Sequence, residues 1–325
     1  MFFYFMVYKL QKNVRNVKSM SDFKLIGHRG YGPTHILGLD APLNQKFPEN
    51  SLPAFQYAVD GGADGIELDV LLSSDGIPVV LHDRHLDKHV AQLPTKLRST
   101  NALDLTYEEL SQLDIGGGNH IPTLNQVIDM FLDKEHSPLY INLDVKNPDL
   151  VVPVLVAIEQ AEALSEHDFV ISSYDWELLK KFRQTSDSIS LVPAMKSTVL
   201  FGEENVKMPG YIPLIDKYDK NLQATLEGLN EEIDFCALDC TFSDLKPELL
   251  DIASSMGVGL QISTGNDRIT GEEADYDALE ILQNTVHNNP DIPFVICKVD
   301  EPDKVRRTLG NLMKTTPENG YDASM

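Results

Sequence analysis

The stretch GIELDVLLSSDGIPVVLHD, residues 65–83, decides how the chain folds, because it holds two apolar runs with little sequence between them. Residues 65–70 and 78–82 both have the β-branched, apolar character of buried strands. Only residues 71–77 join them, and this link contains the turn dipeptide Asp75-Gly76. A parallel crossover needs about a dozen residues or more, so the two runs are predicted to form an antiparallel hairpin.

Similar apolar runs recur along the rest of the chain, and stretches with helical periodicity separate most of them. The other expected strands lie at residues 23–28, 138–145, 168–173, 188–194, 234–239, 258–263 and 293–299. The expected helices include residues 51–63, 123–135, 176–184, 246–257 and 277–287. Alternating strands and helices predict a parallel sheet covered by helices. With the second hairpin arm set aside, eight parallel strands remain, which predicts an α/β fold of the TIM (β/α)8-barrel type.

The chain of 325 residues is long enough for one barrel or for two ordinary domains. The strand pattern favours a single barrel domain over residues 22–312. Residues 83–138 are too many for one loop and are predicted to form an insertion of short helices at the barrel mouth. Residues 1–21 are expected to be an N-terminal extension outside the fold, and residues 313–325 a C-terminal tail.

The formal net charge of -23 argues against nucleic acid and anionic membrane surfaces as general partners, because the field of the molecule repels polyanions. The three cysteines, Cys236, Cys240 and Cys297, are odd in number and have no CxxC spacing. This favours free thiols in a reducing compartment, so a cytoplasmic location is predicted. The pattern leaves the oligomeric state open.

The apolar start of the chain, residues 1–8, precedes the basic residues of the extension, which reverses the order of a secretory signal. It is also too short to span a bilayer. No stable membrane insertion is therefore expected, and an interfacial anchor remains the alternative for this segment.

Ionisable side chains gather where the expected strands end, which is where a barrel carries its active site. They are His28, Glu67, Asp69, His82, Asp144 and Lys146. Glu67 and Asp69 are two residues apart, so they point to the same side of their strand, and Asp144 and Lys146 repeat this spacing. Four segments that are distant in sequence are thus expected to place two imidazoles, three carboxylates and an ammonium at one rim of the barrel.

Three carboxylates that face each other repel unless a cation lies among them. An all-oxygen set favours Mg²⁺ or Ca²⁺ over Zn²⁺, which prefers His and Cys ligands. His28 and His82 are then free for proton transfer, and Arg29 and Lys146 add positive charge for an anionic oxygen. These are the parts that phosphodiester cleavage requires.

Five motifs, GHRG (27–30), PENSLPAF (48–55), GADGIELDV (62–70), SSDGIPVVLHD (73–83) and INLDVK (141–146), carry a specific resemblance. In order and spacing the series resembles that of the glycerophosphodiester phosphodiesterase family. The resemblance covers residues 23–302. It implies a TIM barrel that hydrolyses glycerophosphodiesters, which are small molecules, to glycerol 3-phosphate and an alcohol.

The resemblance also implies roles for single residues. His28 and His82 match the acid/base pair of the family, and Glu67 and Asp69 match two ligands of its divalent metal ion. Arg29, Glu49 and Asn50 fall on positions that contact phosphate and organise the site, and Lys146 falls on its strand-borne lysine.

Two positions depart from the family pattern. Asp144 stands where the third metal ligand is usually Glu, and the resulting DxK resembles the sphingomyelinase D enzymes. Sphingomyelinase D-like or lysophospholipase D-like cleavage of lysophospholipids is therefore the alternative activity. Ser263 stands where the family often has a Trp that lines the site. A barrel that binds a phosphodiester without turnover is a third hypothesis, which the presence of both histidines and all three carboxylates opposes.

Overall fold

The computed structural model describes residues 23–31, 47–86, 97, 100–132, 138–161, 167–195, 222–264 and 289–307. The predicted N-terminal extension, the predicted C-terminal tail and the helix expected at residues 277–287 lie outside the described residues. Among the described residues, no helix combines the length and the apolar character needed to cross a membrane.

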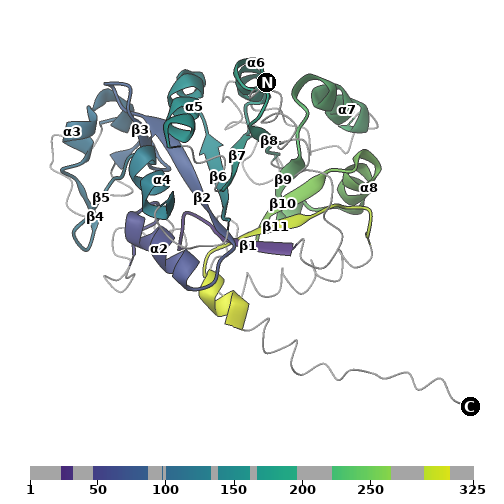
Figure 1. Ribbon diagram of the computed structural model, residues 1–325, viewed down its shortest axis with the longest axis horizontal. Coiled ribbons are helices and arrows are strands. Elements are labelled where there is room, and N and C mark those ends of the chain that lie inside the picture. The colour runs from purple at the N-terminus through teal and green to yellow at the C-terminus, as the bar shows by residue number, and fades with distance from the viewer. Residues whose placement is uncertain are drawn as a thin grey trace, which may run out of the picture.

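The described residues form a parallel β-barrel, with strand order β8-β7-β6-β2-β1-β11-β10-β9 (Figure 1). The strands are β1 (Phe23–Gly27), β2 (Gly65–Leu72), β6 (Tyr140–Val145), β7 (Asp168–Ser173), β8 (Ser190–Pro193), β9 (Ala237–Thr241), β10 (Gly259–Ser263) and β11 (Val295–Val299). A parallel bridge between Ala194 and Asp239 joins the two ends of this order, and the Met195 amide donates to the Asp239 carbonyl at 2.8 Å. The predicted TIM-barrel fold is confirmed.

The predicted hairpin is present. Strand β3 (Pro78–Val80) pairs antiparallel with β2, with Val80 opposite Val70. The Ser73 hydroxyl closes the turn, because it donates to Asp75 Oδ1 at 2.6 Å and accepts from the Ile77 amide at 2.9 Å. Gly76 has a φ of 80°, the left-handed conformation that favours glycine in such a turn. The hairpin therefore forms for the reason that its sequence indicates.

Helices cover the outside of the barrel (Figure 1). They are α2 (Leu52–Asp60), α4 (Leu124–Leu132), α5 (Val151–Gln160), α6 (Trp176–Thr185), α7 (Leu222–Ile233) and α8 (Pro247–Met256), and residues 302–307 are also helical. Their buried apolar side chains pack on the strands in one large core. Single 3-10 turns lie at Pro148–Leu150 and Phe242–Asp244. The expected helices that fall within the described residues all form, and α7 lies within the long connection after β8.

Residues between 83 and 138, where an insertion is predicted, share a second, smaller core with the hairpin beside β3 (Figure 1). Besides α4, the described elements in this range are a 3-10 turn (Ala102–Asp104), α3 (Tyr107–Leu110), β4 (Asp114–Gly116) and β5 (Asn119–His120). Leu86, Leu110 and Ile121 are almost fully buried in this second core. The insertion therefore extends the barrel on the hairpin side.

The barrel interior is layered, because alternate residues of each strand point inward. The lowest layer is an apolar cluster of Ile26, Tyr140, Val170, Val192, Ala237 and Ile296. Two residues further along their strands lie Asn142, Ser172, Asp239 and Lys298, and Gln261 of β10 joins them through hydrogen bonds. We call these five residues the inner polar layer. All five residues are buried, and they lie between the apolar cluster and the rim formed by the carboxyl ends of the strands.

Candidate active site

Two residues with unusual backbone conformations shape the rim after β1. Arg29 has a φ of 52° and Asn50 a φ of 58°, both left-handed conformations that cost a non-glycine residue about 1 kcal/mol or more. The Arg29 amide donates to Glu67 Oε2 at 2.9 Å, and the Asn50 amide donates to the Arg29 carbonyl at 2.9 Å. The strained backbone thus orients Glu67 and joins the two segments that flank it.

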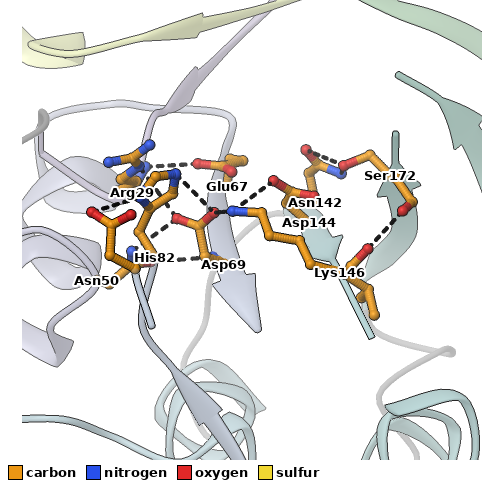
Figure 2. A network of polar contacts seen from close by, with 12 residues as sticks. Arg29, Asn50, Glu67, Asp69, His82, Asn142, Asp144, Lys146 and Ser172 are labelled. Carbon is orange, nitrogen blue, oxygen red and sulfur yellow. Dashed lines mark hydrogen bonds and ion pairs between the residues drawn. The ribbon is translucent and has the colours of Figure 1, made fainter. Parts of the chain in front are cut away.

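Three carboxylates meet at this rim, as the sequence predicts. Glu67 and Asp69 lie on β2, and Asp144 lies opposite Asp69 on the neighbouring strand β6 (Figure 2). One oxygen atom from each of these three side chains lies within 4.8 Å of the other two. Burial and the adjacent Asp69 carboxylate raise the pKa of Glu67. A close, oxygen-only and buried set of donors fits a hard divalent cation such as Mg²⁺ or Ca²⁺.

Lys146 lies among these carboxylates (Figure 2). Its Nζ is 2.7 Å from Asp69 Oδ1 and 3.3 Å from Asp144 Oδ2. Burial raises the pKa of Asp69, but Lys146, His82 and Arg29 together lower it well below its usual value. Burial raises the pKa of Asp144 against the opposing effect of Lys146. Nearby positive charges therefore stabilise the charged form of Asp69 more than that of Glu67 or Asp144.

Asn50 and Arg29 hold Asp69 from the other side. The Asn50 side chain donates from Nδ2 to Asp69 Oδ2 at 3.0 Å and accepts from the Asp69 amide at 3.2 Å. Arg29 Nε lies 3.2 Å from Asp69 Oδ2, and its Nη1 donates to Glu49 Oε1 at 3.0 Å. The guanidinium is thereby held between two acidic side chains, in a buried position next to the acidic cluster.

His28 has a partner that sequence reasoning missed. Its Nδ1 lies 2.9 Å from Asp300 Oδ1, and Asp300 is buried at the end of β11. Burial lowers the pKa of His28, but the hydrogen bond to Asp300 and the nearby carboxylates outweigh this, so the pKa is raised. A carboxylate at Nδ1 favours the tautomer with hydrogen on that nitrogen and leaves Nε2 for chemistry. The signal in the sequence was the spacing of Lys298 and Asp300, which repeats that of Glu67 and Asp69.

His82 follows β3 and approaches the same cluster (Figure 2). Its Nε2 lies 4.0 Å from Asp69 Oδ1, and its Nδ1 lies 3.4 Å from Asp83 Oδ2. Burial and the positive charge of Lys146 lower the pKa of His82 to about 4. The two histidines therefore differ in environment, with the imidazolium favoured at His28 and the neutral ring favoured at His82.

All nine site residues expected from the sequence lie at this one rim. They are His28, Arg29, Glu49, Asn50, Glu67, Asp69, His82, Asp144 and Lys146; contacts given above join all of them except His28, whose side chain contacts Asp300. Asp144 reaches the acidic cluster despite its shorter side chain. The single tryptophan, Trp176, is buried on α6 and donates from Nε1 to the Ala194 carbonyl at 3.1 Å, so it packs against the barrel wall.

The sequence matches the model of the glycerophosphoryl diester phosphodiesterase family over residues 28–209. It is 32% identical over 165 residues to a glycerophosphodiester phosphodiesterase of Caldanaerobacter subterraneus, a match that covers 46% of this chain and 61% of that protein. A glycerophosphodiester phosphodiesterase of Bacillus altitudinis is also 32% identical, over 52% of this chain and 64% of that protein. Both matches thus span less than two thirds of the relative.

Solved structures show the same fold. The crystal structure of a putative glycerophosphoryl diester phosphodiesterase from Silicibacter pomeroyi has a TM-score of 0.66 at 18% identity, and covers 91% of this chain and 96% of its own. An Oleispira antarctica phosphodiesterase, solved in complex with the product sn-glycerol-3-phosphate, has a TM-score of 0.62 at 21% identity, with 88% and 96% coverage. With more than half of its length matched by the family model, the chain belongs to the glycerophosphoryl diester phosphodiesterase family.

Proposed function

We propose that the protein hydrolyses glycerophosphodiesters to glycerol 3-phosphate and an alcohol. The observation that carries this proposal is one rim on which three carboxylates, His82, Arg29 and Lys146 lie close together, with His28 next to Arg29 on the turn after β1 and held by Asp300. Family membership supports it, as does the glycerol 3-phosphate bound to the similar Oleispira fold. The substrate we propose is accordingly a small soluble diester.

We assign Glu67, Asp69 and Asp144 as the ligands of a divalent ion, Mg²⁺ or Ca²⁺. When bound, such an ion supplies positive charge that stabilises the anionic oxygens of the reacting phosphate. Asn50 and Lys146 keep Asp69 in place through the contacts at 3.0 Å and 2.7 Å. We assign Arg29, held by Glu49 at 3.0 Å, and Lys146 as the cations that stabilise phosphoryl oxygens, because both contact the acidic cluster.

His28 and His82 move the protons. The attacking oxygen, from water or from a glycerol hydroxyl, gives its proton to one imidazole as its bond to phosphorus forms. The other imidazole gives a proton to the alcohol oxygen as its bond to phosphorus breaks. If the glycerol hydroxyl attacks, a cyclic phosphate forms first and water then opens it. Asp300 holds the His28 ring through Nδ1 in either role.

The comparisons do not favour the lysophospholipid alternative that the DxK spacing suggested, because the matching family and the relatives are named for glycerophosphodiester phosphodiesterases. The three cysteines are free thiols, which agrees with the cytoplasmic location we propose.

The test is incubation of the purified chain with glycerophosphocholine, followed by ³¹P NMR in chelator and then in added Mg²⁺ or Ca²⁺. We expect glycerol 3-phosphate to appear only with a divalent ion, and His28→Ala and His82→Ala each to lower the rate by about a hundredfold or more. Lys24→Ala, which removes a partly exposed cation at the start of β1, away from the rim, is the matched control and should leave the rate unchanged. Full activity in His82→Ala would remove that histidine from the mechanism.

A further inference from the structure

The inner polar layer carries a buried ion pair that the proposed mechanism does not use. Lys298 Nζ lies 2.9 Å from Asp239 Oδ1 and 2.7 Å from Asp239 Oδ2. Lys298 is 8% exposed and Asp239 is 5% exposed. The middle of a barrel of this type is usually filled with branched apolar side chains, so a charged pair at this depth is unusual.

Hydrogen bonds fix this pair in one arrangement. Gln261 Nε2 donates to Asp239 Oδ2 at 2.8 Å and to Asn142 Oδ1 at 3.0 Å, and the Tyr140 hydroxyl donates to Gln261 Oε1 at 2.9 Å. Burial of two charges costs several kcal/mol per ion, and well-packed apolar residues are often equally stabilising. Stability of the fold is therefore a poor explanation for Lys298 and Asp239.

The pair borders the acidic cluster, because Asn142, which Gln261 joins to Asp239, lies opposite Glu67 in the sheet and precedes Asp144 by two residues on β6. Lys298 precedes Asp300, the partner of His28, by two residues on the same face of β11. The positive charge of Lys298 acts to lower the pKa of Glu67 and of Asp144, and the negative charge of Asp239 acts to raise the pKa of Asp144. The two charges therefore act on the acidic cluster with opposite sign.

We propose that Lys298 and Asp239 act in opposite directions on the affinity of the acidic cluster for its divalent ion, and that their pairing holds this affinity between the two extremes. In the intact pair the two charges largely cancel. The acidic cluster therefore binds the ion through its own negative charge, and the pair adds little repulsion or attraction. Lys298 and Asp239 are positioning residues in this role, since neither touches the ion or the substrate. The inference rests on the metal site of the proposed function.

Opposite changes of charge should move the affinity in opposite directions. Asp239→Asn leaves the Lys298 ammonium unbalanced, so the dissociation constant for Ca²⁺ and Mg²⁺ should rise about tenfold. Lys298→Met leaves an extra negative charge, so the dissociation constant should fall. The double variant removes both charges and should return close to the value of the unmodified chain. Titration calorimetry of the purified full chain without substrate measures all four constants.

The sign of the change separates this role from a structural one, because mere loss of packing would weaken binding in both single variants. Asp168→Asn, which removes an exposed negative charge at the start of β7, is the matched control and should leave the affinity unchanged. Melting temperatures check that each variant folds. If Lys298→Met fails to fold, Lys298→Gln removes the same charge but keeps a polar partner for Asp239, and its dissociation constant should fall as well.

Shifts in the same direction, or no shift in Asp239→Asn, would overturn the inference while leaving the metal site intact. If the unmodified chain bound neither ion, the metal site of the proposed function would itself be refuted, and the inference with it.

Discussion

Single contacts explain why the two histidines of the site differ. His28 has a buried carboxylate, Asp300, at 2.9 Å on Nδ1, whereas His82 is surrounded by the cationic Lys146 and Arg29 as well as by Asp69. Burial acts on both rings in the same direction, and only the charged neighbours decide the net result. The different pKa directions of two chemically identical side chains are thus a property of their surroundings.

Replacement of Asp300 tests the role of this contact. Asp300→Asn keeps the shape but removes the negative charge, so the pKa of His28 should fall, and the limb of the pH–rate profile that belongs to His28 should move to lower pH. The rate should drop about tenfold to a hundredfold, as for other residues that orient a reacting group. Asp291→Asn, an exposed change before β11, is the control. A lower rate with an unmoved limb would mean that Asp300 only supports packing.

At the scale of elements, the turn after β1 and the start of α2 form one unit. Gly30 has a φ of 83°, and a Cβ there would lie 2.8 Å from the Ala54 carbonyl carbon and the Phe55 amide nitrogen. Ser51 begins the helix by accepting from the Ala54 amide at 3.3 Å, directly after Asn50. The close contact between the turn after β1 and the start of α2 therefore fixes the position of Asn50 relative to His28 and Arg29.

Alanine substitutions at Gly30 and Gly76 distinguish the energetic cost of overpacking against α2 from the cost of a left-handed backbone conformation. Gly30→Ala should lower the free energy of unfolding by the cost of a left-handed alanine, about 1 kcal/mol, plus about 1–3 kcal/mol for overpacking against α2. Gly76→Ala, at a φ of 80° with no atom within 4 Å of the added carbon, should lower the free energy of unfolding only by the cost of the left-handed alanine. Urea denaturation measures both values. Equal losses would show that α2 moves away from Gly30 without cost.

At the scale of the whole molecule, electrostatics are dominated by the net charge of -23. Repulsion among so many acidic residues destabilises the compact state, and any cation relieves part of it by screening. A divalent ion held by Glu67, Asp69 and Asp144 would add stabilisation through specific binding to the folded chain alone. Screening and binding differ in their dependence on concentration and on the identity of the ion.

Calorimetric melting distinguishes the two effects. At matched ionic strength, Mg²⁺ or Ca²⁺ should raise the melting temperature more than NaCl does. The added free energy of unfolding should grow with the logarithm of ion concentration and reach about 2.7 kcal/mol at a hundred times the dissociation constant. Asp144→Ala should reduce this excess, because one ligand is lost. The same rise for NaCl and for the divalent ions would indicate screening alone.

Most of the fold could be predicted from the sequence, because its elements depend on local patterns. The apolar runs of the strands, the Asp75-Gly76 turn and the helical periodicity between strands all act over a few residues, and the barrel follows from their order. The grouping of Glu67, Asp69 and Asp144 was equally accessible, since they lie two apart on one strand or at the carboxyl end of another, and parallel strands end at one rim. The strand-end positions also indicated His28, His82, Arg29 and Lys146, and the resemblance to the family motifs added Glu49 and Asn50.

Only the tertiary structure decided which of these side chains contact one another. Asp300 lies 272 positions from His28 and meets it because β11 closes the barrel beside β1. Lys298 and Asp239 pair because their strands, separated by β10, both point these residues inward. A local sequence pattern indicates which face of a strand a residue occupies. The closure and stagger of the barrel determine which residue lies opposite to it. The sequence by itself therefore determined the barrel and its acidic rim, and the packed barrel decided the partners that give each charge its effect.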